Sequence, residues 1–495
     1  MIKKISISYP PLESEKWTPL LSQNRQFQWF EWDPTYIFPM IPAYTATLLK
    51  SKWYEVLWDD GIAEWLTYKD WLDRILAYKP DLIMIETKTP TVSRMRTIID
   101  ELKSKIPDTK IVLVWDHITA FPDQSFGHCN VDWTLKSGDY DFSLLNLVSY
   151  LNGKEELKWG WYWKDWDEIK NSWPQNLMEN DLNTLPFIDR ELVKWKLYAY
   201  KNWNFKYTPW TYTMVGRDCW WWRCTFCSWT TFFPGKNYRM ISAQRLLDEI
   251  EQILIPLGIK EVFDDSGSLP ASDWLKEFCQ WMIDRWLNKK IYFSHNMRFG
   301  ALTREHYELM AKANFRYILY WVESANQATL DKIDKNLKFE VIEEELRMIK
   351  DVNKQTWWCI SPHITTMIGY PWETYEDAKK TVDFAKRMFQ EWLIYTLQST
   401  IIMPYPGTPL YRQALQNDRL AIPDGERDRF DMRERILKSP LTPEQTKELV
   451  QWVYKSFLSP KVVINKILSV RSWDDVKFLF RAWKKLLNHL LDFKK

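Results

Sequence analysis

The sequence has no long hydrophobic run. Its start, MIKKISISYPPLE, contains two lysines, but no apolar stretch of signal-peptide length follows them. No later run reaches the roughly 18 uninterrupted apolar residues of a membrane span. We therefore expect a chain without a transmembrane segment, located in the cytoplasm.

Cysteine is sparse and the net charge is small. Of six cysteines, three fall within nine residues, and Cys129, Cys279 and Cys359 are scattered. This distribution argues against a disulfide framework and predicts one metal site plus buried thiols, in a reducing compartment. The net charge of +2 gives no signature of nucleic-acid binding.

Glycine is scarce, and tryptophan is abundant. Only 13 of 495 residues are glycine and 32 are tryptophan, whereas glycine usually makes up about 7% of a protein. Trp53, Trp166, Trp286 and Trp372 stand in turn and cap contexts, where a positive φ or a close backbone approach favours glycine. We hypothesise that many tryptophans here are glycine in the source, through a stop codon reassigned to glycine but translated as tryptophan. The alternative is a protein that is truly rich in tryptophan.

The first 150 residues alternate short apolar runs with helical patterns. A chain of this length suggests two or three domains. Strands alternating with helices indicate parallel βαβ units, so residues 1–150 are expected to form a doubly wound, Rossmann-like α/β domain. The expected strands are 4–10, 53–60, 81–87 and 110–116, and the expected helices lie near 42–52, 68–79 and 94–105.

The alternation resumes after a less periodic segment. Residues 151–205 are interpreted as a linker with a hairpin, and residues 431–495 as a C-terminal helical region. Between them, six strand-and-helix units over 206–430 predict a partial (β/α)6 TIM-type barrel, with its chemistry at the strand carboxyl ends. The expected barrel strands are 211–218, 260–266, 290–296, 317–324, 363–369 and 397–403.

Three cysteines follow the first expected barrel strand, in GRDCWWWRCTFCSW (216–229). Cys219, Cys224 and Cys227 are separated by four residues and then by two, which lets their sulfurs converge on one metal centre. A structural zinc ion needs a fourth ligand, and none lies close by in the sequence. A four-iron four-sulfur (4Fe-4S) cluster held by three cysteines leaves one iron open to chelate S-adenosylmethionine (SAM). Zinc with a distant fourth ligand and buried structural thiols remain alternatives.

This loop resembles the radical SAM superfamily, in which three cysteines follow the first strand of a partial TIM barrel. The usual spacing there is three then two, so the four-residue gap is a departure. The segment CTFCSW looks like the family, with Phe226 in the aromatic position before the last cysteine. Neighbouring Trp220, Trp221 and Trp229 could exclude water from a cluster, or could simply pack in the core.

Later strand ends match the superfamily in order. The resemblance implies that SAM is contacted by Asp264, Asp265, Asn296, Arg298, Glu323 and Ser324, although the aspartate pair could instead cap the next helix. MIGYPWET (367–374) resembles the strand-five motif, with Gly369 kept and Trp372 where a second glycine is expected. At the sixth strand end, Gly407 would let the backbone approach the adenine.

The N-terminal domain, which opens with a strand and a Pro-Pro dipeptide, resembles the cobalamin (B12)-binding subclass of radical SAM proteins. Ligands of such sheets bind outside the strand carboxyl ends. This placement implies cobalamin contacts from Thr87, Thr89, Asp116, His117, Ser137, Gly138 and Asp139. No Asp-x-His-x-x-Gly motif is present, so no histidine is expected to coordinate cobalt from below. The alternatives are a scaffold without a cofactor and a domain for another nucleotide.

Taken together, the resemblance implies an anaerobic radical SAM enzyme with a 4Fe-4S cluster, SAM and cobalamin. The reduced cluster would cleave SAM to methionine and a 5'-deoxyadenosyl radical that abstracts hydrogen from a small-molecule substrate. Methylcobalamin could then methylate an unactivated carbon, and some relatives instead cyclise or rearrange their substrates. A reductant such as ferredoxin or flavodoxin is the expected partner.

Two rival functions remain open. A methylthiotransferase acting on RNA or protein carries a second cysteine trio in its N-terminal domain, whereas only Cys129 lies upstream of Cys219 here. A non-catalytic cobalamin or redox sensor would use the cluster structurally. Formation of 5'-deoxyadenosine from SAM and dithionite separates the enzyme from the sensor. The sequence does not identify the substrate.

Overall fold

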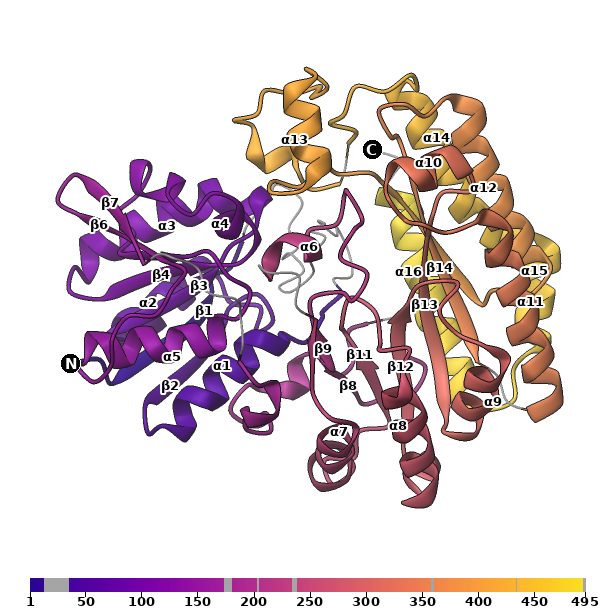
Figure 1. The fold of residues 1–495 in the computed structure, drawn as a ribbon, viewed down its shortest axis with the longest axis horizontal. Coiled ribbons are helices and arrows are strands. Elements are labelled where there is room, and N and C mark those ends of the chain that lie inside the picture. The colour runs from indigo at the N-terminus through magenta and orange to yellow at the C-terminus, as the bar shows by residue number, and fades with distance from the viewer. Residues whose placement is uncertain are drawn as a thin grey trace.

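The structure is a computed structural model that describes residues 1–12, 35–172, 180–202, 204–233, 238–357, 360–432 and 434–492. These residues form two α/β regions that lie side by side, one built on a mostly parallel sheet and one on a curved parallel sheet (Figure 1). This architecture confirms the expected order of a doubly wound domain followed by a partial barrel. Cys359 lies outside the described residues.

The N-terminal sheet is built on five parallel strands. Its order is β2-β1-β3-β4-β5, so the strand order reverses beside β1, which makes the carboxyl ends of β1 and β3 the switch point. Nearly every residue of β1, β3 and β4 is buried, as expected where helices cover both faces. The elements are β1 (Lys4–Tyr9), α1 (Met40–Ser51), β2 (Glu55–Asp60), α2 (Tyr68–Tyr78), β3 (Leu82–Glu86), α3 (Val92–Lys105), β4 (Lys110–Val114), α4 (Asp116–Ala120), β5 (Trp133–Leu135) and α5 (Tyr140–Leu151).

The expected hairpin is present, but it belongs to this sheet. β6 (Trp161–Asp165) pairs antiparallel with β5, and β7 (Glu168–Asn171) continues the sheet to seven strands. The first part of the expected linker therefore extends the N-terminal domain. All four residues of β7 are exposed, so this edge of the sheet faces solvent.

The second region carries six parallel strands in the order β15-β14-β13-β12-β11-β8, as a partial barrel requires. A helix follows most strands and packs outside the sheet. The carboxyl ends of the strands point toward the N-terminal domain and α13 (Figure 1). The elements are β8 (Trp210–Thr213), α6 (Trp229–Phe232), α7 (Ala243–Glu249), β11 (Glu261–Asp264), α8 (Asp273–Asp284), β12 (Tyr292–Met297), α9 (Arg304–Lys312), β13 (Phe315–Glu323), α10 (Gln327–Lys332), α11 (Phe339–Thr356), β14 (Ser361–Ile368), α12 (Tyr375–Gln390), β15 (Thr396–Ile401) and α13 (Pro409–Gln416).

Three helices complete the chain: α14 (Pro443–Lys455), α15 (Pro460–Leu468) and α16 (Trp473–Asp492). The helix α15 was not expected from the sequence. α14 packs on β15, and Arg481 of α16 donates hydrogen bonds to the carbonyls of Phe205 and Lys206, just before β8. The last helix thus runs across the open side between the last and first barrel strands. No described helix is long and apolar enough to cross a membrane.

A buried charge cluster joins the two regions. Arg217, in the short strand β9 (Gly216–Arg217), lies 2.8 Å from a carboxylate oxygen of Asp139 and also pairs with Asp141. Arg239, in β10 (Arg239–Met240), binds Asp139 as well. Both aspartates are fully buried. We call Asp139, Asp141, Arg217 and Arg239 the junction cluster, because their ion pairs hold the segment after β5 against the start of the cysteine loop.

The backbone is left-handed at many tryptophans. Positive φ occurs at Trp53, Trp65, Trp115, Trp166, Trp222, Trp286, Trp357 and Trp392. Several of these directly follow a helix, where glycine is the usual residue. Three of the four positions singled out in the sequence are therefore glycine-type positions. Trp372 is not among them: its indole donates to Thr329 Oγ1 over 3.2 Å and stacks on Tyr370.

Candidate functional site

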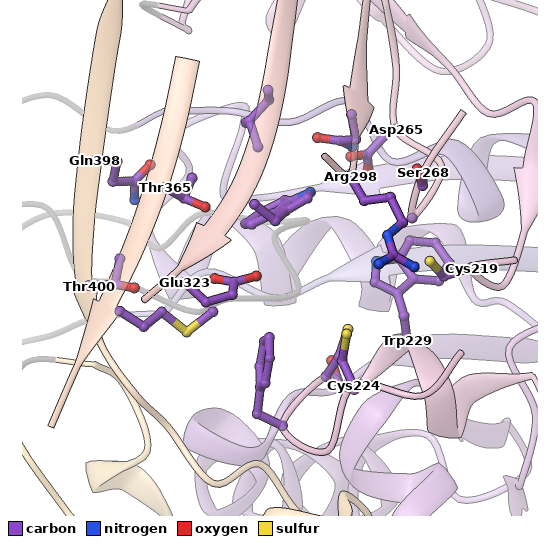
Figure 2. Close-up of a pocket in the computed structure, with 18 of the residues that line it drawn as sticks. Cys219, Cys224, Trp229, Asp265, Ser268, Arg298, Glu323, Thr365, Gln398 and Thr400 are labelled. Carbon is purple, nitrogen blue, oxygen red and sulfur yellow. The ribbon is translucent and has the colours of Figure 1, made fainter. Parts of the chain in front are cut away.

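A cavity of about 240 Å³ lies at the carboxyl ends of the barrel strands, and all three clustered cysteines line it. Cys219, Cys224 and Cys227 lie on the loop that connects β9 to α6. Figure 2 shows Cys219 and Cys224 on one side of the space, with Glu323 at the end of a barrel strand facing them. The loop after β11 packs closely here, since a Cβ on Gly267 would lie 2.8 Å from Cys219 Cβ.

The thiols sit in a poorly solvated place. Burial raises the pKa of Cys219, and it raises the pKa of Cys224 to about 11 although Lys335 lies close by. A bound metal displaces such a thiol proton, because the thiolate is the ligand. No described group of three His, Cys, Asp or Glu side chains converges on a single-ion site. A four-iron cluster has no such requirement, because each thiolate binds a different iron.

Two cations and one carboxylate lie beside the thiols. Lys335 Nζ is 2.9 Å from Glu323 Oε1, and both side chains are buried. The guanidinium of Arg298 lies 3.7 Å from the centroid of the Trp221 ring and donates to the carbonyl of Lys335 over 2.8 Å. Glu323 has a φ of 68°, an unfavourable conformation for a residue with a Cβ. The strand end is therefore held in a strained form that aims the carboxylate at the cavity.

The opposite wall is uncharged. Thr365 of β14 and Gln398 and Thr400 of β15 face the cavity from the far strands (Figure 2). Apolar side chains lie between them and the thiols, including Leu319 and Met367. The cavity thus has a charged end beside the cysteines and a neutral end deeper in the barrel.

Seven of the predicted site residues line this cavity: Cys219, Cys224, Cys227, Asp265, Asn296, Arg298 and Glu323. Trp221, Phe226 and Trp229 also line it, so these aromatic residues do face the place where a cluster would be held. Trp220 instead donates its indole N–H to the carbonyl of Leu269 over 3.1 Å. The strand-end rule therefore brought together residues that are about 100 positions apart.

The remaining predicted barrel residues lie around the cavity without lining it. Asp264 accepts hydrogen bonds from Val215 N at 2.7 Å and from Ser266 Oγ at 2.9 Å, and burial raises its pKa to about 7. It thus joins the segment after β8 to the segment after β11 and does not cap α8, whose N-cap residue is Ser272. Ser324 Oγ accepts from Asn326 N at 3.1 Å, just before α10.

The two predicted glycines are turn residues. Gly369 and Gly407 have φ of 91° and 85°. Gly369 N donates to Glu373 Oε2 over 2.6 Å. A Cβ on Gly407 would lie 3.2 Å from the Cβ of Ala120, so this loop packs on α4 of the N-terminal domain.

At the strand ends of the N-terminal sheet, the predicted residues are buried by neighbouring protein atoms. Thr87 N donates to Val114 O, and Thr87 Oγ1 has no hydrogen-bond partner in the described chain. Burial raises the pKa of Asp116 to about 7 and lowers that of His117 to about 3. His117 Nε2 lies 2.9 Å from Gln124 Oε1 and its Nδ1 is 3.4 Å from Oγ1 of Thr89, so both ring nitrogens face protein atoms.

The third predicted segment of this domain forms the junction. Ser137 Oγ accepts from Asp139 N at 3.0 Å, and Gly138 N donates to Phe232 O over 2.7 Å. A Cβ on Gly138 would come within 2.5 Å of the Phe233 ring. In this structure the glycine and the aspartate therefore dock the barrel loop.

Sequence reasoning missed several residues of the site. Lys335 stands in an ordinary-looking loop, DKIDKNLKF, and only the fold reveals that it pairs with Glu323. Gln398 and Thr400 read as plain strand residues. Gly267 and Arg217 lie in or beside the motifs considered in the sequence but were not selected. Because glycine is scarce in this chain, Gly267 could have been recognised as a position of close packing.

Residues 215–385 match the radical SAM superfamily. The chain contains a radical SAM domain. The matched span runs from just before the cysteine loop into α12, so it includes the thiols, Arg298, Glu323 and Lys335. The prediction of a radical SAM enzyme is confirmed.

Curated relatives of this radical SAM protein span most of its length. It is 26% identical over 438 residues to an uncharacterized methyltransferase of Pyrococcus horikoshii, covering 87% of this chain and 90% of the relative. It is 23% identical over 412 residues to the anaerobic magnesium-protoporphyrin IX monomethyl ester cyclase of Rubrivivax gelatinosus, covering 81% and 69%.

Solved structures share the whole two-region fold. OxsB, a cobalamin-dependent SAM radical enzyme solved with aqua-cobalamin and SAM bound, matches with a TM-score of 0.69 and 15% identity, over 99% of this chain and 72% of OxsB. TsrM of Kitasatospora setae, a radical SAM methyltransferase solved with cobalamin and a [4Fe-4S] cluster, matches with a TM-score of 0.64 and 15% identity, over 84% and 78%.

Proposed function

We propose that this radical SAM protein holds a 4Fe-4S cluster on Cys219, Cys224 and Cys227 and cleaves SAM in the adjoining cavity. The observation that carries the proposal is that the three thiols, two cations and two carboxylates line a single cavity of about 240 Å³. The donor set fits, because three thiolates leave one iron of such a cluster open.

When bound, the cluster supplies the electron that cleaves SAM to methionine and a 5'-deoxyadenosyl radical, which abstracts hydrogen from the substrate. The protein supplies position and exclusion of water. Lys335 and Glu323 offer a cation and an anion, which match the carboxylate and the amino group of SAM. Trp221, Phe226 and Trp229 line the same cavity as the thiols and are proposed to limit the access of water to the cluster.

A small neutral molecule is the proposed substrate. The deep end of the cavity offers hydroxyl and amide groups from Thr365, Gln398 and Thr400 between apolar side chains, and it has no charge of its own. An external reductant such as ferredoxin or flavodoxin is proposed to reduce the cluster, since the proposed chemistry needs one electron for each SAM cleaved.

The second candidate function is methyl transfer with cobalamin, with cyclisation as its variant. Relatives named as a methyltransferase and a cyclase favour it, as do solved neighbours that hold cobalamin. The residues present do not fit that cofactor, however. The cavity between the N-terminal strand ends and the barrel measures only about 20 Å³, far below the 300 Å³ or more of an ordinary ligand pocket.

Anaerobic reconstitution tests the proposed function. Protein loaded with iron and sulfide is incubated with SAM and dithionite, and 5'-deoxyadenosine and methionine are measured by mass spectrometry. We expect both products. An intact cluster, seen by electron paramagnetic resonance, without 5'-deoxyadenosine would instead support the redox-sensor alternative.

Two cysteine variants make this test specific. Cys224→Ala is expected to lose the cluster signal and to bring product formation down to the background without enzyme. Cys279→Ala is the matched control: this thiol is buried in α8, away from the loop, so its loss should cost only about 1 kcal/mol of stability and leave the cluster intact. If both variants keep activity, the cysteine assignment is wrong.

A further inference from the structure

The last helix, α16, carries large apolar side chains on two opposite sides. On its inner side, Phe478 is buried and stacks on Tyr395 with ring centroids 5.8 Å apart. On its outer side, Phe480 is 72% exposed and Leu487 is 51% exposed. A helix that is apolar all round is normally buried. The outer side of α16 is therefore an apolar surface that no described residue of the chain covers.

The exposed residues in the middle of α16 share one side of the helix. Between positions 476 and 487 they are Val476, Lys477, Phe480, Lys484 and Leu487. At 100° per residue they fall within a sector of about 100°. We call these five residues the outer face. Tryptophan is not among them, so the outer face is the same whichever residue the source protein has at its tryptophan positions.

Polar contacts on the inner side fix the direction in which the outer face points. Asp475 Oδ1 lies 2.5 Å from Lys206 Nζ, and Arg481 donates hydrogen bonds to the carbonyls of Phe205 and Lys206. These contacts tie α16 to the segment before β8, across the open side of the barrel. Rotation of the helix would break them, so the apolar outer face stays turned to solvent.

Charge is unevenly distributed along the chain, and α16 lies in its basic part. Residues 460–495 contain nine Lys or Arg and three Asp or Glu, a net charge of +6, which leaves −4 for residues 1–459. The charged members of the outer face are both lysines. Large apolar side chains beside lysines on one helix face are typical of a helix that lies in an anionic membrane surface. The acidic remainder of the chain would be repelled by such a surface, which favours one orientation.

We propose that the outer face of α16 docks on a membrane surface that contains anionic lipid. Val476, Phe480 and Leu487 enter the boundary between headgroups and acyl chains, and the two lysines bind the headgroup phosphates. A second copy of this chain is a poorer occupant, because a two-fold contact through this face would bring the same lysines together. The inference goes beyond the proposed function and does not rest on it.

Vesicle sedimentation of the full-length protein tests this surface. The protein is mixed with vesicles of phosphatidylcholine alone, and with vesicles of phosphatidylcholine and phosphatidylglycerol in equal parts. We expect binding to the anionic vesicles to be at least about tenfold tighter, and an ionic strength of about 0.5 M to remove most of this difference. Absence of binding to both vesicles, or equal binding to both, would overturn the proposal without any variant being needed.

A double variant removes the apolar part of the outer face. Phe480→Ser combined with Leu487→Ser is expected to weaken binding to the anionic vesicles at least about tenfold, because less apolar surface enters the membrane. Leu415→Ser is the matched control: this leucine of α13 is 44% exposed, close to the exposure of Leu487, and its loss should leave binding unchanged. Unchanged binding by the double variant would contradict the proposal.

A second double variant removes the charges. Lys477→Gln combined with Lys484→Gln is expected to weaken binding to the anionic vesicles by about tenfold or more, and to have little effect with phosphatidylcholine alone. Lys52→Gln combined with Lys105→Gln is the control, because these exposed lysines lie at helix ends of the N-terminal domain. Equal losses for the two pairs would mean that net charge, and not this helix, determines binding.

Two further measurements separate the proposal from its rivals. A dimer in light scattering that Phe480→Ser dissociates would show that a second copy covers the outer face, and would overturn the membrane assignment. The formation of 5'-deoxyadenosine by Phe480→Ser in buffer without vesicles should equal that of the unchanged chain, because α16 provides none of the residues proposed to hold the cluster or SAM. Failure of the membrane surface and failure of the radical SAM function are thus read from different assays.

Discussion

Two regions of this molecule have the same position in their sheets and opposite contents. Both lie at the carboxyl ends of parallel strands, where α/β proteins place their ligands. In the barrel, that edge holds a cavity of about 240 Å³ with paired charges and three thiols. In the N-terminal sheet, side chains close the same edge to about 20 Å³, and the polar groups there bind one another.

The difference lies in what each region needs from its residues. The barrel site is made of side chains that carry chemistry, and each is held by a partner: Lys335 by Glu323, and Arg298 by loop carbonyls. The N-terminal edge is instead packed on the barrel loop, where Gly138 N donates to Phe232 O and Asp139 pairs with Arg217. Trp115, which has a positive φ at this edge, lines the small space that remains there.

The largest effect is expected where the two regions meet. Arg217→Ala leaves Asp139 and Asp141 buried without their main cation, so we expect a loss of about 3–5 kcal/mol in the free energy of unfolding. Urea denaturation measures it. Lys69→Ala removes an exposed pair with Asp73 and should leave the free energy of unfolding essentially unchanged. A loss below about 1 kcal/mol for Arg217→Ala would mean that the junction cluster does not join the regions.

The stability that the junction cluster contributes is expected to depend on pH. Burial alone would raise the pKa of Asp139, but Arg217 and Arg239 together hold it below its ordinary value of 3.8. A depressed carboxyl pKa contributes stability that is present above the unfolded value and is lost as the pH falls through the folded one. The penalty of Arg217→Ala should therefore be largest near neutral pH and should shrink once the pH falls below 3.8.

The sequence predicted more of the barrel site than of the N-terminal edge, and the reasons are physical. Cysteine spacing and polar residues after apolar strands are local signals, and parallel strands bring their ends together by rule. Asp264 and Asp265 are neighbours in sequence, yet only Asp265 faces the cavity, because successive residues point to opposite sides of a strand. Lys335 carries no local signal, since its role depends on a loop folding back on Glu323.

At the N-terminal edge, the sequence signals pointed to real strand ends but did not show what those ends contact. Gly138 and Asp139 were predicted beside a cofactor, which stays a prediction, and in the structure they contact the barrel loop. Such a contact between regions has no local pattern. The hairpin was found in the right place, but its pairing with β5 depends on a sheet edge that the sequence cannot show.

The next prediction concerns Glu373, a buried carboxyl group of the barrel region that is expected to be neutral in the folded protein. Burial raises the pKa of Glu373 from 4.5 to about 8, while the N–H groups of Gly369 and Tyr370 lower it. A raised pKa means that its stabilising contribution is complete below pH 4.5 and is lost as the pH rises toward 8. Glu373→Gln keeps the neutral form, so its stability relative to the unchanged chain should rise with pH, by about 2–3 kcal/mol between pH 5 and pH 7.

Thermal unfolding at a series of pH values measures this difference. Glu343→Gln serves as a control of opposite sign, because its arginine partners lower the pKa of Glu343 to about 2. That variant should lose relative stability as the pH rises from about 2 to 4.5 and should show no further change above 4.5, and the loss should be small because the pair is near the surface. Parallel curves for Glu373→Gln and the unchanged chain would show that Glu373 is ionised in the folded protein.

The smallest effect is expected at a tryptophan with a positive φ in the barrel region. Trp286 has a φ of 58° directly after α8, and its side chain is 69% exposed. Glycine relieves the left-handed backbone and sacrifices little packing, so Trp286→Gly should stabilise the protein by about 1 kcal/mol. Trp71→Gly is the contrasting change: this ring is fully buried and donates to Asp59 over 2.6 Å, so its loss should cost about 3–5 kcal/mol. If Trp286→Gly instead destabilised the chain, this helix end would not be a glycine-type position.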